Sequence, residues 1–177
     1  MKHNFTYKLL EKMDDDVLSD LKEYAVLGPF VVSNDFAEYS IKITPTAHLS
    51  DTPALQKLFD RHMSKYFTID GHVGSNISRM SPYSYVPEHS DYAAGVYGAK
   101  QNRIIKFQIP IITNPGAGLM WKFNAVHKST ALHLEEGGIY AFDNCRIHSS
   151  VNFSSEYRYW LTSRWSSDHL IDQSLLS

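Results

Sequence analysis

The second half of the sequence is a succession of short β-type segments separated by turns, and this pattern constrains the fold more than any other feature. Turn residues such as Asn114-Pro115-Gly116 and Glu136-Gly137-Gly138 divide the segments, as in antiparallel sheets. We expect eight strands, over residues 74–80, 83–89, 104–112, 118–123, 129–134, 138–142, 147–152 and 157–165. This pattern predicts an antiparallel sandwich or a jelly roll. Eight strands fit a cupin-like double-stranded β-helix, in which two four-stranded sheets open at one end to hold a metal.

The first 70 residues differ, because their apolar residues recur at the spacing of a helix. One stripe is interrupted by the acidic residues 14–16, where we expect a turn or a helix start, and it comprises Leu9, Leu10, Met13, Val17 and Leu21. A second helix is expected to begin at Thr52-Pro53, and its apolar stripe comprises Leu55, Leu58, Phe59, His62, Met63 and Tyr66. We therefore predict one mostly β domain over 1–177, with a helical support region at 1–70 and the β core at 74–166.

Length and composition agree with one domain, since 177 residues of which 43% are apolar suffice for a core. The formal net charge of −2, with both signs interspersed, predicts neither a nucleic-acid partner nor a membrane surface. No apolar signal core follows Met1, and no apolar run is long enough for a membrane span, so we expect a cytoplasmic protein. Cys145 is the sole cysteine, which excludes an internal disulfide and a multi-cysteine zinc site.

Two histidines and an aspartate form the most informative set of side chains in the β region. His89 and Asp91 are two residues apart at the end of an expected strand, so their side chains face the same side. His148 begins another expected strand and can supply a third ligand. Two imidazoles and one carboxylate on one face of a divalent metal are the ligand set of non-haem Fe(II) oxygenases. We therefore predict that these three residues bind iron.

Other interpretations of these histidines stay open at this point. An H-x-D pair occurs often by chance, and the alternative is a surface turn at 89–91 together with a strand histidine that makes ordinary hydrogen bonds. His133 is the main competitor as a ligand, because Leu132-His133-Leu134 is strand-like and could face the same cavity. An arginine ten residues after His148 strengthens the metal interpretation.

That arginine, Arg158, suits a co-substrate that carries a carboxylate. A guanidinium group is planar, stays charged when partly buried and binds a carboxylate through two N–H donors. Arg164 shares the same strand face but lies about 20 Å further along an extended strand, which makes Arg158 the better anchor. The alternative is a structural salt bridge of Arg158 with Glu156 or Glu135. Polar residues could complete the carboxylate site, the candidates being Ser78, Ser81, Tyr83 and Thr130.

These residues belong to a set of motifs that resembles a known family, the aspartyl/asparaginyl β-hydroxylase-like branch of the Fe(II)/2-oxoglutarate-dependent dioxygenases. The resemblance covers residues 77–165, about half the chain, in the order and spacing of the family. It rests on Ser78-Arg79-Met80, Pro87-Glu88-His89-Ser90-Asp91, Ile109-Pro110-Ile111-Ile112-Thr113-Asn114-Pro115, Glu136-Gly137-Gly138-Ile139-Tyr140-Ala141-Phe142-Asp143-Asn144, His148-Ser149-Ser150-Val151-Asn152 and Arg158.

The resemblance implies Fe(II) bound by His89, Asp91 and His148. It also implies that Arg158 binds the distal carboxylate of 2-oxoglutarate. Asp91 matters here, because the namesake hydroxylases lack that carboxylate whereas many small-molecule relatives keep it. One position departs from the family pattern, since Lys106-Phe107-Gln108 replaces an Arg-x-His pair near the metal-proximal carboxylate of the co-substrate. Lysine and glutamine can still donate to a carboxylate, although lysine offers a point charge and no planar fork.

The expected activity is that of an Fe(II)- and 2-oxoglutarate-dependent dioxygenase, which uses O₂ and hydroxylates an amino acid, a peptide or a related small substrate while releasing succinate and CO₂. We expect substrate choice to depend on residues 1–70 and on the loop 92–103, which could act as a lid or be an ordinary connector. Two other classes stay open. They are a cupin-type metal enzyme that does not use 2-oxoglutarate and a jelly-roll protein that binds ligands without catalysis.

Overall fold

The computed structural model of the chain describes residues 7–27, 30–34, 37–43, 52–90, 104–122, 129–142 and 146–176. The helical segments are α1 (Asp15–Leu27), α2 (Pro53–Leu58), the π-helical segment η2 (Phe59–Met63) and the short 3-10 turns η3 (Ile69–Gly71), η5 (Ser167–His169) and η6 (Gln173–Leu176). The strands are β1 (Tyr7–Lys12), β2 (Phe30–Asn34), β3 (Ala37–Ile43), β4 (His72–Met80), β5 (Ser84–His89), β6 (Ile104–Ile112), β7 (Ala117–Lys122), β8 (Ser129–Leu132), β9 (Gly138–Phe142), β10 (His148–Asn152) and β11 (Arg158–Ser166). None of the helices in these ranges is long and apolar enough to cross a bilayer.

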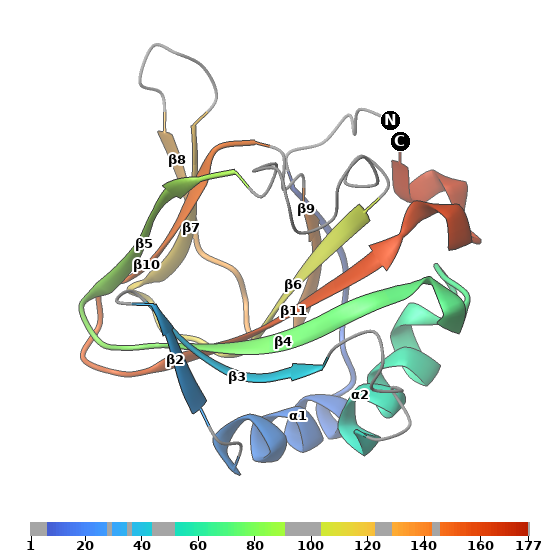
Figure 1. Cartoon of the computed structure of the whole chain (residues 1–177), viewed down its shortest axis with the longest axis horizontal. Helices are drawn as coiled ribbons and strands as arrows, with labels where there is room; N and C mark the ends of the chain where they lie inside the picture. The colour runs from blue at the N-terminus through green and yellow to red at the C-terminus, as the bar shows by residue number, and fades with distance from the viewer. Residues whose placement is uncertain are drawn as a thin grey trace.

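The strands form two antiparallel sheets that face each other (Figure 1). The larger sheet has the strand order β1-β9-β6-β11-β4-β3-β2, and the smaller one has the order β5-β10-β7-β8. Each sheet contains four of the eight strands from β4 to β11. The larger sheet contains β4, β6, β9 and β11, and the smaller sheet contains β5, β7, β8 and β10. This topology is the double-stranded β-helix that the strand pattern predicts.

The eight predicted strands lie within two residues of the observed ones, and the segments 104–112 and 138–142 match fully. Three further strands, β1 to β3, extend the larger sheet beyond the expected four. One prediction is wrong, because Leu9 and Leu10 lie in strand β1 and not in a helix. β1 pairs with β9, and this pairing satisfies the backbone hydrogen-bonding groups of the segment. The segment has only six residues, which are too few for the spacing of apolar residues to distinguish a strand from a helix. Residues 1–70 therefore contribute strands as well as helices.

The two predicted helix starts are found in the structure. Asp15 and Asp16 occupy the first turn of α1, where a negative charge complements the positive end of the helix dipole. The residues buried along α1 are Val17, Leu21 and Ala25, four residues apart. Pro53 opens α2, which continues directly into η2. The acidic run 14–16 is thus a helix start, as expected.

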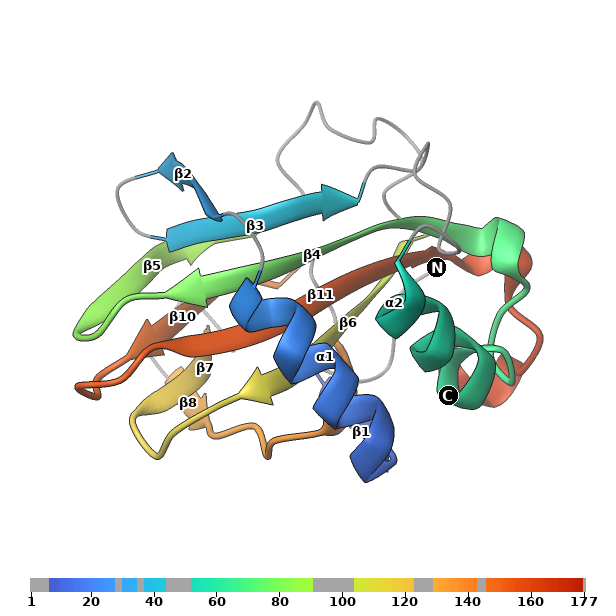
Figure 2. The ribbon, with the colours of Figure 1, turned by 90° about the horizontal axis from the view of Figure 1, so that it is seen from below.

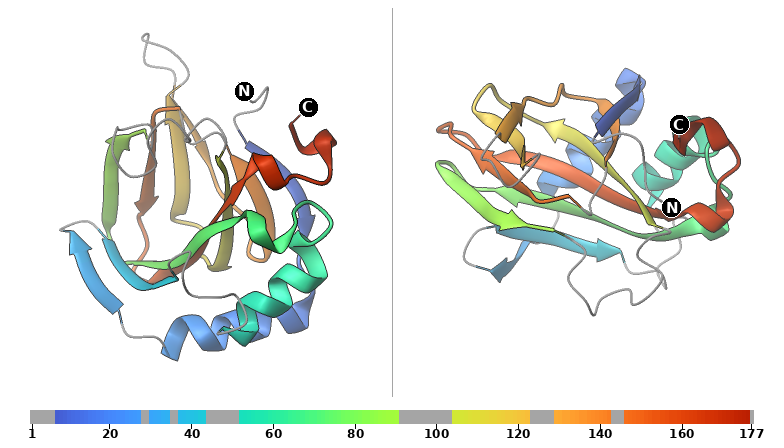
Figure 3. Two further views of the ribbon diagram at one scale, coloured as in Figure 1. Left: turned by 45° about the vertical axis from the view of Figure 1, so that its right-hand side comes forward. Right: turned by 90° about the horizontal axis from the view of Figure 1, so that it is seen from above.

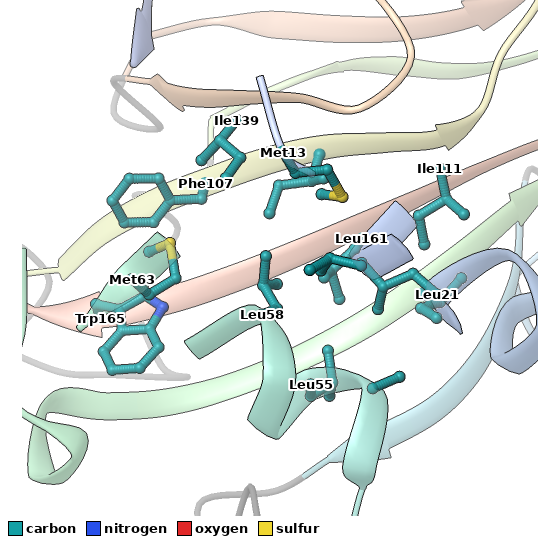
Figure 4. Packing of buried hydrophobic residues seen from close by; sticks show 14 of the residues in the cluster. Met13, Leu21, Leu55, Leu58, Met63, Phe107, Ile111, Ile139, Leu161 and Trp165 are labelled. Carbon is teal, nitrogen blue, oxygen red and sulfur yellow. The ribbon is translucent and has the colours of Figure 1, made fainter. Parts of the chain in front are cut away.

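Helices α1 and α2 cover the outer face of the larger sheet (Figure 2; Figure 3, left). Side chains alternate between the two faces of a strand, so every second residue of the sheet points toward the helices. On β6 these residues are Ile105, Phe107, Ile109 and Ile111. Figure 4 shows Phe107 and Leu161 of the sheet in one apolar cluster with Leu21 and Leu58 of the helices. This packing holds the larger sheet against a rigid support.

The inner face of the larger sheet points toward the smaller sheet and carries polar side chains. Lys106 and Gln108 alternate with the apolar residues Ile105, Phe107 and Ile109 of β6, and they are only 8% and 6% exposed. A second apolar cluster, which includes Trp121 and Trp160, fills part of the space between the sheets. Burial of charged and polar side chains is costly unless they find partners, so this inner face indicates a functional site.

Candidate active site

The two histidines predicted from the sequence meet at one edge of the smaller sheet. His89 ends β5 and His148 begins β10, and the two are antiparallel pairing partners. Their ring centroids lie 4.5 Å apart. Both rings line a cavity of about 130 Å³ between the sheets. The structure therefore brings together two imidazoles that are 59 residues apart in the sequence.

Each of these rings is held by a backbone carbonyl group two residues earlier in the chain. Nδ1 of His89 lies 2.8 Å from the carbonyl oxygen of Pro87, and Nδ1 of His148 lies 2.8 Å from that of Arg146. A carbonyl oxygen can only accept, so Nδ1 donates, and in the neutral tautomer the lone pair is on Nε2. Metal-binding histidines have this arrangement, and the two rings fit a divalent metal such as iron.

The third predicted ligand, Asp91, lies outside the described residues, as do the loop 92–103 and the side chain of Thr130. Within the part of the chain that the structure describes, no group of three or more His, Cys, Asp or Glu side chains gathers where it could hold a metal. The described donors are thus the two imidazoles. Asp91 follows His89 by two residues.

Arg158 is buried in the same cavity, with only 2% of its surface exposed. It is the first residue of β11, and its Nη2 donates a hydrogen bond to Oγ of Ser150 on β10. Nε lies 3.3 Å from Sδ of Met80, and the guanidinium carbon lies 3.6 Å from the centroid of the Trp160 ring. Ser150 is two residues from His148, so one strand connects the imidazole to the guanidinium. These three partners of Arg158 are uncharged.

The other predicted co-substrate residues line the same cavity from the larger sheet. Gln108 accepts a hydrogen bond from Oγ1 of Thr162, with 3.2 Å between the oxygen atoms. Oγ of Ser78 lies 3.3 Å from the carbonyl oxygen of Trp160. Nζ of Lys106 lies 4.8 Å from the centroid of the Phe142 ring. Lys106, Gln108 and Ser78 thus surround one space together with Arg158.

Two other predicted candidates, Tyr83 and His133, lie away from this cavity, which Ser81 does not line either. Tyr83 is 73% exposed in the turn before β5, and its backbone φ is 54°. His133, the competing ligand, is exposed, and its Nδ1 lies 3.0 Å from the carbonyl oxygen of Ala117. Neither residue is among those that line the cavity. His133 therefore takes no part in the described site.

The cavity is also lined by residues to which sequence reasoning gave no role in the site, among them Asn76, Phe142 and Ser150. Ser150 could have been found, because residues two apart on a strand share a face and it follows His148 by two. Phe142 carries no polar signal, yet its ring lies 5.6 Å from that of His148 across the two sheets. Only the packing of the two sheets shows that Phe142 lines the cavity.

The sequence profile of the aspartyl/asparaginyl beta-hydroxylase family matches residues 35–166. The chain belongs to this family. The predicted family and its enzyme class, a 2-oxoglutarate-dependent oxygenase, are thereby confirmed. The match begins well before residue 77, where the motifs of the sequence start, so strand β3 also belongs to the family domain. A comparison with curated proteins finds no match.

Several solved structures have the same fold as this protein, although their sequence identity to it is low. An oxidoreductase of the 2OG-Fe(II) oxygenase family from Burkholderia pseudomallei has a TM-score of 0.63 and 13% identity, with 92% of this chain and 84% of that chain covered. The viral collagen prolyl hydroxylase of Paramecium Bursaria Chlorella virus-1, in its 2OG complex, has a TM-score of 0.60 and 15% identity, with 92% and 96% covered. HygX from Streptomyces hygroscopicus, with nickel and 2-oxoglutarate bound, has a TM-score of 0.66 and 9% identity, with 91% and 82% covered. These similarities support the jelly-roll fold.

Proposed function

We propose that this protein binds Fe(II) and 2-oxoglutarate and uses O₂ to hydroxylate an amino acid, a peptide or a related small substrate. One oxygen atom of O₂ enters the new hydroxyl group and the other enters succinate, while the lost carboxyl group leaves as CO₂. Bound iron and 2-oxoglutarate supply the oxidising chemistry. The protein supplies binding, orientation and exclusion of competing reactions.

The observation that carries this proposal is the meeting of an imidazole pair and a buried guanidinium in one cavity. Nδ1 of His89 and Nδ1 of His148 each face a backbone carbonyl oxygen, which leaves Nε2 for a metal, and Arg158 lies in the cavity that the two rings line. A cupin-type metal enzyme without a dicarboxylate co-substrate has no need of this guanidinium. A binding protein on the same fold needs neither the imidazole pair nor the buried guanidinium.

In this proposal the iron is bound by His89, Asp91 and His148. These two imidazoles and one carboxylate would hold the metal and leave positions for the co-substrate and O₂. The carbonyl groups of Pro87 and Arg146 orient the imidazoles, because each accepts the Nδ1 proton. Asp91 reduces the net charge of the metal centre by one.

The co-substrate in this proposal lies between the metal and Arg158. The guanidinium binds the distal carboxylate, since a planar fork with several N–H donors matches a carboxylate. Lys106 and Gln108 assist the metal-proximal carboxylate, and Ser78 completes the site of the carboxylate that Arg158 binds; all three line the cavity. Lys106 takes the place of a family arginine and offers charge without a second coplanar donor.

The proposed substrate class follows the proteins that share the fold. The structures of similar fold include collagen prolyl hydroxylase and a prolyl-4-hydroxylase from Pseudomonas putida, which their names describe as hydroxylases. Their names support hydroxylation as the outcome of the reaction.

Substrate-stimulated succinate release tests the proposal. The purified protein is supplied with Fe(II), 2-oxoglutarate and O₂, and amino acids and short peptides are screened for faster succinate formation. We expect release that requires Fe(II) and increases with the correct substrate. Metal-dependent turnover without consumption of 2-oxoglutarate would support the cupin alternative. Metal retention without any turnover would support the binding-protein alternative.

A further inference from the structure

The described side chains that line the cavity include three cations, Arg158, Lys106 and Arg164, and no acidic residue. The proposed co-substrate has two carboxylates, for which Arg158 and Lys106 are the partners. Iron with Asp91 adds a further positive charge. The two carboxylates of the co-substrate are thus assigned to Arg158 and Lys106, and the metal centre is itself positive. Neither supplies a negative charge to Arg164.

Arg164 lies directly beside Lys106 on the inner face of the larger sheet. Lys106 pairs with Arg164 of β11 on one side and with Phe142 of β9 on the other, so the three residues form one row across the sheet. Like charges directly opposite each other on neighbouring strands destabilise a sheet. An anion bound between the two side chains removes that repulsion.

The row also places Arg164 at the metal end of the cavity. The Phe142 ring, at the other end of the row, lies 5.6 Å from the ring of His148. Arg158, by contrast, is six residues earlier on β11, which corresponds to about 20 Å along an extended strand. The proposed function assigns both carboxylates of the co-substrate to other partners, the distal one to Arg158 and the metal-proximal one to the iron and Lys106. The anion at Arg164 therefore belongs to a different molecule.

Arg164 is also held in place within the cavity. Its Nη1 donates to Oδ1 of Asn76 at 2.9 Å, and the residue opposite it on β4 is Gly74, which has no side chain to occupy that space. A guanidinium has five N–H donors, and this contact uses one of them. A planar carboxylate fits the remaining fork better than it fits a lysine.

We propose that Arg164 binds a carboxylate of the substrate and thereby determines which molecules are hydroxylated. This inference rests on the proposed function, because it divides the cations of the cavity between co-substrate and substrate. Lys106 lies between the two anions and contributes to both. Arg164 is a specificity-determining residue in this arrangement, and the preferred substrates carry a carboxylate near the carbon that is oxidised.

Matched pairs of ligands test this assignment. N-acetyl amino acids and the corresponding N-acetyl amino amides differ only in the carboxylate, and both sets are titrated calorimetrically against the full chain loaded with Fe(II) and 2-oxoglutarate without O₂. The variants are Arg164→Gln and Arg164→Lys. Arg61→Gln is the control, because Arg61 is 57% exposed on η2 and the substitution removes the same charge away from the cavity. Melting curves verify that each variant is folded.

We expect at least one acid to bind ten times more tightly than its amide, as for a charged hydrogen bond. Arg164→Gln should abolish that preference and leave the amide affinity within about twofold, with partial recovery in Arg164→Lys and no change in Arg61→Gln. A panel in which no acid binds more tightly than its amide overturns the inference. So does an acid preference that persists in Arg164→Gln.

The affinity for 2-oxoglutarate is measured separately, so that two kinds of failure are distinguishable. If the wild-type protein does not bind 2-oxoglutarate, the proposed function fails. If 2-oxoglutarate binds equally well to wild type and Arg164→Gln while acids and amides do not differ, only the assignment of Arg164 fails. A large loss of 2-oxoglutarate affinity in Arg164→Gln contradicts the division of the cations and also overturns the inference.

Discussion

The guanidinium carbon of Arg158 lies 3.6 Å from the centroid of the Trp160 ring, two residues further along β11. Residues two apart on a strand share a face, so the indole lies beside the guanidinium within the cavity. The attraction between a cation and an aromatic face is strongest where water is excluded, and both residues are at most 2% exposed. Trp160 and Ser150 together orient Arg158 without neutralising its charge.

Replacement of Arg158 tests its role as the co-substrate anchor. We expect Arg158→Ala to raise the apparent requirement for 2-oxoglutarate at least tenfold, because a charged hydrogen bond is worth about 1.5–3 kcal/mol and a bidentate pair more. Arg158→Lys should recover part of the loss, since an ammonium restores charge but not the two-point contact. Titration of 2-oxoglutarate measures both effects. A salt-bridge role for Arg158 instead predicts lower melting temperatures and an unaltered 2-oxoglutarate requirement in the folded variants.

Ser150→Ala is expected to act through Arg158. The substitution removes the hydroxyl that accepts from Nη2 and keeps the charge, so the requirement for 2-oxoglutarate should rise severalfold and less than in Arg158→Ala. Metal content, measured in the same samples, should not change. Equal 2-oxoglutarate affinity in Ser150→Ala and wild type would show that the hydroxyl does not position the guanidinium.

Removal of either imidazole is expected to eliminate iron binding. His89→Ala and His148→Ala each remove one of the described donors, and two remaining ligands hold a divalent metal poorly. Metal content after anaerobic loading with Fe(II) measures the loss directly, and succinate release should disappear with it. His133→Ala is the matched control, because His133 is exposed outside the cavity. Normal metal content and activity in His148→Ala would remove the central element of the proposed site.

The stability of the protein should depend on pH through His72. This ring packs at 5.0 Å from that of Trp165, and burial lowers the pKa of His72 to about 4 from its ordinary value of 6.5. The unfolded chain therefore binds a proton below pH 6.5 that the folded chain does not bind until about pH 4. The contribution of His72 is fully present above pH 6.5 and declines as the pH falls toward 4, by at most about 1.4 kcal/mol per pH unit.

Urea unfolding at several pH values between 4.5 and 7.5 measures this dependence. His72→Gln is neutral throughout this range, so the free energy of unfolding should vary less with pH in the variant than in wild type. The same slope in both proteins would assign the pH dependence to other groups.

The stability of the protein should fall when a substitution leaves a cavity in the apolar layer between the larger sheet and helices α1 and α2. Leu161 is fully buried in this layer, and Leu161→Ala should lower the free energy of unfolding by about 2–5 kcal/mol. Leu9→Ala makes the same chemical change at a residue that is 49% exposed, and its cost should be well below that range. Urea denaturation of both variants measures the difference. Equal losses would mean that Leu161 does not support the sheet.

Local patterns in the sequence predicted most of the strands and both helix starts. The segment 104–112 was expected as a strand because turn residues separate it from its neighbours, and in a strand Lys106 and Gln108 share one face because the period is two. The same rule failed for Leu9 and Leu10, since a six-residue segment is compatible with either period. Its state depends on β9, which lies more than 120 residues away and provides its hydrogen-bonding partners.

The sequence by itself determined which residues are candidates for the chemistry and which of them share a face of a strand. Only the tertiary structure decided that His89 lies opposite His148, that Ser150 meets Arg158 and that Arg164 stands beside Lys106. Each of these relationships depends on strand register or on the packing of two sheets. Register is a property of two segments that are distant in sequence, and a shift of one residue would turn each side chain to the opposite face. No local pattern contains that information, so the arrangement of the site follows from the fold.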